Sequence, residues 1–255
     1  MQEFDFFIGI PTYKRARSQT TLDYLEKLGI EKERIVMSVQ CAEDDKEYRE
    51  AGVDKRVGAF IYRDGKNVSE NTNTILDYVP SGARVVLLDD DIKSVCWLSD
   101  GKLKDICRRD DFFAVVRRGY ALADKHATTG FCVYPVCNAF FMKNGYETRA
   151  LGIGTLLAVT NNGERFDRTL SVKQDYEYIL RAIKKHGAFI RLNGIACNAK
   201  HYTKGGCEEF WEDKQRNMWI ARNIVRRYPE LVKLNPNKPG EIMIIRKGGN
   251  KNAGK

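Results

Sequence analysis

One segment indicates the fold class of this chain more clearly than any other: Arg84-Val85-Val86-Leu87-Leu88-Asp89-Asp90-Asp91-Ile92. Its four apolar residues in a row are typical of a short strand that is buried on both faces, as in the middle of a parallel sheet. Three carboxylates then follow at the end where ligands bind to open α/β sheets. Such crowded acidic side chains are tolerated either in a solvated turn or around a hard divalent cation, for which Mg²⁺ and Mn²⁺ are the natural choices.

Three apolar runs precede this predicted strand in the sequence. They lie at residues 6–10, 35–39 and 59–62, and each is followed by a segment with helical character. Ser18 is a candidate N-cap for the first helix, and Asn67 opens the third. Regular strand–helix alternation predicts right-handed βαβ units and a parallel sheet.

The second half of the sequence has a different pattern. Asp100-Gly101 lies between two short strand-like runs and predicts a hairpin. Amphipathic helices are expected at 110–126, at 172–187 and at 210–228, the last with Trp211, Met218, Trp219 and Ile220 facing inward. Strands are expected at 131–134, 139–142, 155–159, 189–192 and 242–245. No linker divides the chain, so we expect one domain over 1–245, with halves at 1–92 and 93–245, and a basic disordered tail at 246–255.

Composition limits the class of protein. The 255 residues are 43% hydrophobic, which is enough for a sizeable core, and no apolar run is long enough to span a membrane. The acidic start is unlike a signal peptide, and seven scattered cysteines without a CxxC pair suggest free thiols in a reducing cytoplasm. The net charge of +9 favours a polyanionic partner or an anionic substrate, although simple solubility would also explain it.

A strand that ends in Pro11-Thr12-Tyr13-Lys14-Arg15, then alternating strands and helices, then Asp89 to Asp91, resembles the GT-A class of nucleotide-sugar glycosyltransferases. The hairpin after the triplet, the Phe166-Asp167 loop and the helix that starts at Gln174-Asp175 match the acceptor side of that class. The resemblance covers residues 6–205. It implies a Rossmann-like α/β fold with a mostly parallel central sheet and a mixed acceptor half.

The resemblance also implies roles for particular residues. Those expected to bind the nucleotide-sugar donor are Pro11, Thr12, Tyr13, Arg15, Gln40, Ser69, Asn73, Asp89 and Asp90, with Glu43 near the base. Asp91 and His201 are expected to hold Mn²⁺ or Mg²⁺. Thr72 stands where the class has an arginine, and Gln174 where it has a glutamate; these are the two departures.

Asp175 is the expected general base. Breaking a sugar–phosphate bond leaves a diphosphate that a divalent ion stabilises, while a carboxylate on another element can take the proton of the acceptor hydroxyl. The alternative for Asp175 is a carboxylate that only stabilises a helix N-terminus, and the alternative for His201 is an ordinary loop residue.

The acceptor is the least determined part. Three features carry a narrower resemblance: Phe166-Asp167 before Gln174-Asp175-Tyr176-Glu177, the run Arg191-Leu192-Asn193, and the loop from His201 to Gly206. In these the chain resembles the compact bacteriophage enzymes that glycosylate hydroxymethylated pyrimidines in DNA. That resemblance implies a UDP-sugar donor, a modified DNA acceptor and a cytoplasmic location in the host, with no membrane partner. A basic helix at 216–227 would follow phosphates. Three alternatives stay open: a glycosyltransferase for a surface polysaccharide, a nucleotidyltransferase, and a non-catalytic nucleic-acid-binding module.

Overall fold

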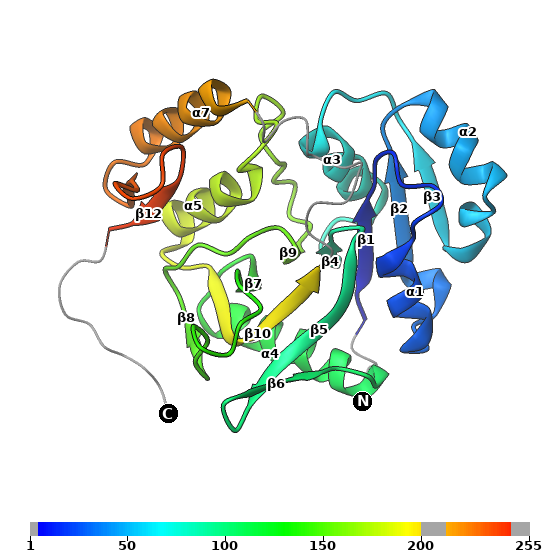
Figure 1. Ribbon diagram of the computed structural model, residues 1–255, viewed down its shortest axis with the longest axis horizontal. Coiled ribbons are helices and arrows are strands. Elements are labelled where there is room, and N and C mark those ends of the chain that lie inside the picture. The colour runs from blue at the N-terminus through cyan, green and yellow to red at the C-terminus, as the bar shows by residue number, and fades with distance from the viewer. Residues whose placement is uncertain (1–4, 200–212, 246–255) are drawn as a thin grey trace.

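The computed structural model describes residues 5–199 and 213–245, which form a mixed sheet with helices on both faces (Figure 1). The strands are β1 Phe7–Pro11, β2 Ile35–Val39, β3 Ala59–Tyr62, β4 Arg84–Leu88, β5 Ile92–Ser99, β6 Lys102–Asp105, β7 Gly130–Tyr134, β8 Tyr146–Glu147, β9 Leu156–Thr160, β10 Ile190–Ala199, β11 Val232–Leu234 and β12 Ile242–Ile244. The helices are α1 Thr20–Lys27, α2 Ala42–Glu50, α3 Val68–Tyr78, α4 Arg109–Lys125, α5 Gln174–His186 and α7 Lys214–Arg227, with short 3-10 turns at Lys32–Arg34 and Val53–Arg56.

The main sheet has the order β3-β2-β1-β4-β9-β7-β10-β5-β6, and β8 pairs with β10. The four strands β3, β2, β1 and β4 run parallel, as the strand–helix alternation predicts. Strand order reverses between β1 and β4, and such a switch point is where open α/β sheets bind ligands. On its other side, β4 pairs antiparallel with β9, so it also borders the mixed half of the sheet.

The sheet separates two apolar cores. On one face, Leu22 and Leu25 of α1 join Phe112 and Val116 of α4 in a single buried cluster. On the other face, a second cluster contains side chains of α3 and α5, among them Ile75 and Ile179. A third cluster joins α5 to α7 through Leu180, Ile220 and Ile224, so α7 forms an additional layer outside α5. Figure 1 shows α7 at the edge of the molecule above α5.

Several local expectations are confirmed. Asp100 and Gly101 both have positive φ, 52° and 72°, as a type I′ hairpin turn between β5 and β6 requires. The side chain of Asn67 accepts a hydrogen bond from the backbone N–H of Glu70 and so caps α3. Gly187 ends α5 with φ of 80°.

Three local expectations are wrong. Residues 139–142 form turns rather than a strand, because the side chain and carbonyl of Asn138 accept the N–H groups of Phe140 and Phe141. Gln19, not Ser18, precedes α1. Trp219 faces outward and is 62% exposed. Within 5–199 and 213–245, no helix is both long and apolar enough to cross a membrane.

Candidate active site at the end of β4

The acidic triplet lies at the carboxyl end of β4, and Thr21 at the start of α1 holds its backbone. The Thr21 hydroxyl donates to the carbonyl of Asp89 at 2.5 Å and accepts the N–H of Ile92 at 2.8 Å. The N–H of Thr21 donates to the carbonyl of Asp90 at 3.3 Å. These bonds fix the turn from β4 into β5, so the positions of the three carboxylates are set by backbone contacts.

Asp90 is turned toward the loop that follows β1. Its carboxylate accepts a hydrogen bond from the Thr12 hydroxyl at 2.6 Å and forms an ion pair with the Arg15 guanidinium. Removal from water raises the pKa of Asp90, while Arg15 and Thr12 oppose this rise. Asp90 therefore joins the triplet to the β1 loop.

Two residues that the sequence did not single out fix the β1 loop. Tyr48 of α2 is fully buried; its hydroxyl lies 2.6 Å from that of Thr12 and accepts the N–H of Arg15 at 2.9 Å. Asp44 accepts the N–H of Lys14 at 3.0 Å, and Lys14 has a positive φ of 53°. The one available signal was an acidic residue soon after β2, where side chains reach the same sheet edge as the β1 loop.

The other two carboxylates of the triplet differ in their surroundings. Asp91 lies 3.2 Å from the Arg15 guanidinium, which partly neutralises it. Asp89 has no side-chain hydrogen bond or ion pair within the described part of the chain. The pKa of Asp89 is raised to about 8. The largest cause is removal from water, and repulsion from Asp91, Asp90 and Asp175 adds to it. The site thus concentrates negative charge that a cation would relieve.

Asp175 reaches this site from the first turn of α5. Its carboxylate accepts the N–H of Gly154 at 2.7 Å and the N–H of Tyr176 at 2.8 Å. Gly154 precedes Thr155, whose carbonyl accepts the N–H of Asp89 at 3.3 Å. Residues far apart in sequence are therefore joined through the segment that leads into β9. Burial raises the pKa of Asp175 to about 6, although the two N–H groups and the charge of Lys173 oppose the rise.

Ser69 and Asn73 contact the loop before α5. The Ser69 hydroxyl donates to the carbonyl of Leu170 at 2.8 Å. The Asn73 amide donates to the carbonyl of Phe166 at 2.9 Å and accepts its N–H at 2.8 Å. In this structure both side chains hold the segment that leads to Asp175, so they connect α3 in the first half of the chain to α5 in the second.

The remaining residues of the predicted site are placed as follows. Pro11 ends β1, and Tyr13 is half-buried beside Lys14. Gln40 follows β2 and is 7% exposed, and its side-chain oxygen has no hydrogen-bond partner within residues 5–199 and 213–245. A buried oxygen of this kind can accept a hydrogen bond from an N–H or O–H group on the base or sugar of a ligand. His201 lies outside the described residues.

The donor set fits a hard divalent ion. Asp89 and Asp91 offer carboxylate oxygens, which Mg²⁺ and Mn²⁺ prefer. No group of three or more His, Cys, Asp or Glu side chains within the described chain forms a ready metal cage. Magnesium is commonly held by one or two carboxylates together with substrate phosphates, so a two-carboxylate set matches that mode of binding.

Two solved structures share this architecture. S. aureus TarS 1–349, in complex with UDP, aligns with a TM-score of 0.51 at 13% identity, over 89% of this chain and 72% of that chain. The mannosyltransferase PcManGT from Pyrobaculum calidifontis, in complex with GDP-Man and Mn²⁺, aligns with a TM-score of 0.57 at 16% identity, over 91% of this chain and 66% of that chain. No family model matches the sequence, and no curated protein does. At these identities the likeness shows the fold, which is the GT-A fold of nucleotide-sugar glycosyltransferases.

Proposed function

We propose that this chain is a metal-dependent glycosyltransferase that moves a sugar from a nucleotide-sugar donor to a hydroxyl acceptor. The observation that carries the proposal is the approach of Asp175 to the acidic triplet through Gly154 and Thr155. Asp175, a carboxylate with a raised pKa, is suited to take a proton from the acceptor, and the carboxylates of the triplet are of the kind that can hold a divalent ion at the donor.

In this proposal the donor lies along the carboxyl edge of β1, β2 and β4. The residues around it are Pro11, Thr12, Tyr13, Arg15, Gln40, Asp89 and Asp90, while Ser69 and Asn73 support the site through the loop before α5. Asp91, with Asp89 beside it and His201 from the segment after β10, would hold Mn²⁺ or Mg²⁺. The bound ion would stabilise the negative charge of the diphosphate leaving group.

Asp175 then acts on the acceptor. Its carboxylate takes the proton of the attacking hydroxyl, while the N–H groups of Gly154 and Tyr176 hold the carboxylate in place. Arg15 forms ion pairs with Asp90 and Asp91. When a donor binds, the Arg15 guanidinium can turn from these carboxylates to the donor phosphates.

We further propose a UDP-sugar as the donor and a 5-hydroxymethylpyrimidine in phage DNA as the acceptor, in the cytoplasm of the host. The excess of basic residues supports an anionic acceptor. A base that is modified inside a duplex would have to be turned out of the stack to reach Asp175.

The test is transfer itself. The protein is incubated with a panel of nucleotide sugars, Mn²⁺ or Mg²⁺, and DNA with or without 5-hydroxymethylcytosine, and the DNA is analysed by mass spectrometry. A gain of one hexose only on modified DNA is the expected result, and Asp91→Asn should abolish it. Transfer to a saccharide but not to DNA would reject the DNA acceptor, and no nucleotide release from any donor would reject the enzyme.

A further inference from the structure

The outer helix α7 has an unusual composition. Its 14 residues, Lys214–Arg227, contain five lysine or arginine residues and no acidic residue. Like charges on neighbouring turns of a helix repel one another, and acidic residues at helical spacing would relieve that repulsion. A helix that keeps five cations without acidic residues of its own therefore favours contact with a polyanion.

The two faces of α7 differ sharply. Asn217, Ile220, Ala221 and Ile224 are buried, and the three apolar ones belong to the cluster shared with α5. Trp219 is on the outer face and is 62% exposed. An exposed indole with arginines on the same helix offers the aromatic ring and the positive charge that proteins use to bind single strands.

Three exposed cations of α7, Lys214, Arg222 and Arg226, have no carboxylate partner among the described residues. Among the described residues Lys214 and Arg222 form no ion pair, and the one polar partner of the Arg226 side chain there is Asn223, whose side-chain oxygen accepts a hydrogen bond from it at 3.3 Å. With Trp219 they form what we call the outer face of α7. Their charge is not compensated by neighbouring carboxylates of the described chain.

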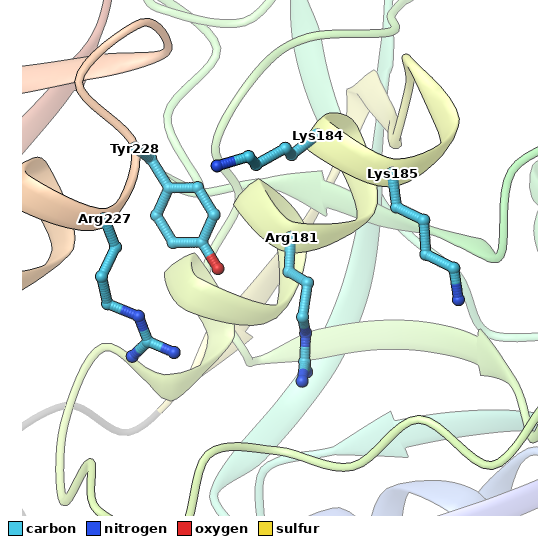
Figure 2. A pocket seen from close by; sticks show the side chains of 5 residues that line it. All are labelled: Arg181, Lys184, Lys185, Arg227 and Tyr228. Carbon is cyan, nitrogen blue, oxygen red and sulfur yellow. The ribbon is translucent and has the colours of Figure 1, made fainter.

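The seam between α5 and α7 provides a contrast. An open pocket of about 350 Å³ lies there, lined by Arg181, Lys184, Lys185, Arg227 and Tyr228. Figure 2 shows these five side chains on and beside the two helices. Each of its cations has an acidic partner: Glu177 at 3.6 Å from Arg181, Glu230 at 3.9 Å from Lys184, Glu164 at 2.6 Å from Lys185 and Asp167 at 2.7 Å from Arg227. The seam is therefore close to neutral, whereas the outer face of α7 is not.

The first turn of α7 is joined to the segment that carries the proposed base through Asn217, on the buried face of the helix. Asn217 accepts a hydrogen bond from the buried Lys173 ammonium at 3.2 Å, and Lys173 is two residues before Asp175. At a rise of about 1.5 Å per residue, α7 extends roughly 15 Å from Asn217 to Arg227, which is several nucleotides of a strand.

We propose that the outer face of α7 binds a strand of nucleic acid, with Lys214, Arg222 and Arg226 on its phosphates and Trp219 stacked on a base. Stacking on an aromatic side chain and contacts to the backbone together are the usual means of binding single strands. The role of this surface in delivering the acceptor rests on the proposed function, but the binding itself needs neither donor nor metal.

The test is fluorescence anisotropy with a labelled single-stranded oligodeoxynucleotide over a series of salt concentrations. Arg222→Gln with Arg226→Gln should lower the slope of log K against log salt by about 1.4, because two phosphate contacts are lost. Trp219→Ala should weaken binding roughly 5- to 100-fold with little change in slope, and Trp219→Phe should restore most of it. Arg117→Gln with Arg118→Gln, an exposed pair on α4, is the control with the same loss of charge.

Equal losses in the α7 pair and the α4 pair would overturn the proposal, since only net charge would then matter. It would also be overturned if anionic vesicles or polyglutamate competed as well as DNA and Trp219→Ala had no effect. If the protein binds the strand but transfers sugar to no acceptor, strand binding by α7 is supported and the proposed function is rejected. If it transfers sugar to a free hydroxymethylated nucleoside but does not bind the strand, the proposed function is supported and strand binding by α7 is rejected.

Discussion

Asp175→Asn is the most informative single change. The two side chains have nearly the same shape, but the amide cannot accept a proton. If Asp175 is the general base, transfer should fall by about 10²- to 10⁴-fold, the usual contribution of such a group. The readout is nucleotide release at saturating acceptor and metal.

The pH dependence of the wild-type rate tests the same assignment. With a pKa of about 6, Asp175 is mostly deprotonated at neutral pH, and its active fraction falls roughly tenfold between pH 7 and pH 5. The rate should therefore rise with pH through about 6. The residual rate of the Asn variant should lack this step.

Stability should change in the opposite direction to activity. The folded pKa of Asp175, about 6, lies above its ordinary value of 3.8, so the ionised group opposes folding by about 3 kcal/mol above pH 6, and this penalty disappears as the pH falls below 4. Asn removes the penalty but loses one accepted N–H bond, worth about 1 kcal/mol. Denaturant unfolding should show the variant as stable as wild type or up to about 2 kcal/mol more stable at pH 8, with no such advantage at pH 4.

Asp167→Asn, in the loop before α5, is the matched control. Burial acts to raise the pKa of Asp167, yet the hydrogen bonds from Thr169 and the contact with Arg227 outweigh burial and hold this pKa below its ordinary value. Its ionised form therefore stabilises the fold above the ordinary carboxyl pKa, and its Asn variant should be less stable than wild type at pH 8. If Asp175→Asn loses stability as Asp167→Asn does, and keeps its transfer rate, the reasoning about the base is refuted.

Three further changes test the framework around the site. Asn73→Ala leaves both backbone groups of Phe166 without their partner and should destabilise by about 2–4 kcal/mol in denaturant unfolding, with transfer falling in parallel; full stability would show that the loop has other support. Thr12→Val removes the hydroxyl that donates to Asp90 and should weaken nucleotide binding in calorimetry, whereas Thr12→Ser should keep it; equal affinities in both would contradict this. Gly119→Ala should destabilise by about 1–3 kcal/mol despite the helix preference of alanine, because a Cβ there meets an aromatic ring of β7 at 2.5 Å; a raised melting temperature would refute it.

Much of the fold was predictable because its signals are local. Short apolar runs bounded by polar turns give the parallel strands, and an Asp-Gly pair gives the β5–β6 hairpin. Trp219 was misplaced since helical periodicity alone does not say which apolar residues a partner helix covers. Residues 139–142 were misplaced because the hydrogen bonds of Asn138 outweigh the strand preference of the apolar run.

Local sequence patterns are enough to predict that three carboxylates follow a buried strand and that another carboxylate begins a later helix. The spatial relation of these four carboxylates depends on the tertiary fold. Asp90 is held by Thr12 and Arg15, Asp89 is left without a side-chain partner in the described chain, and Asp175 is joined to them through Gly154. The physical reason is that β9 pairs with β4 over a long sequence separation, and no local pattern encodes such a pairing.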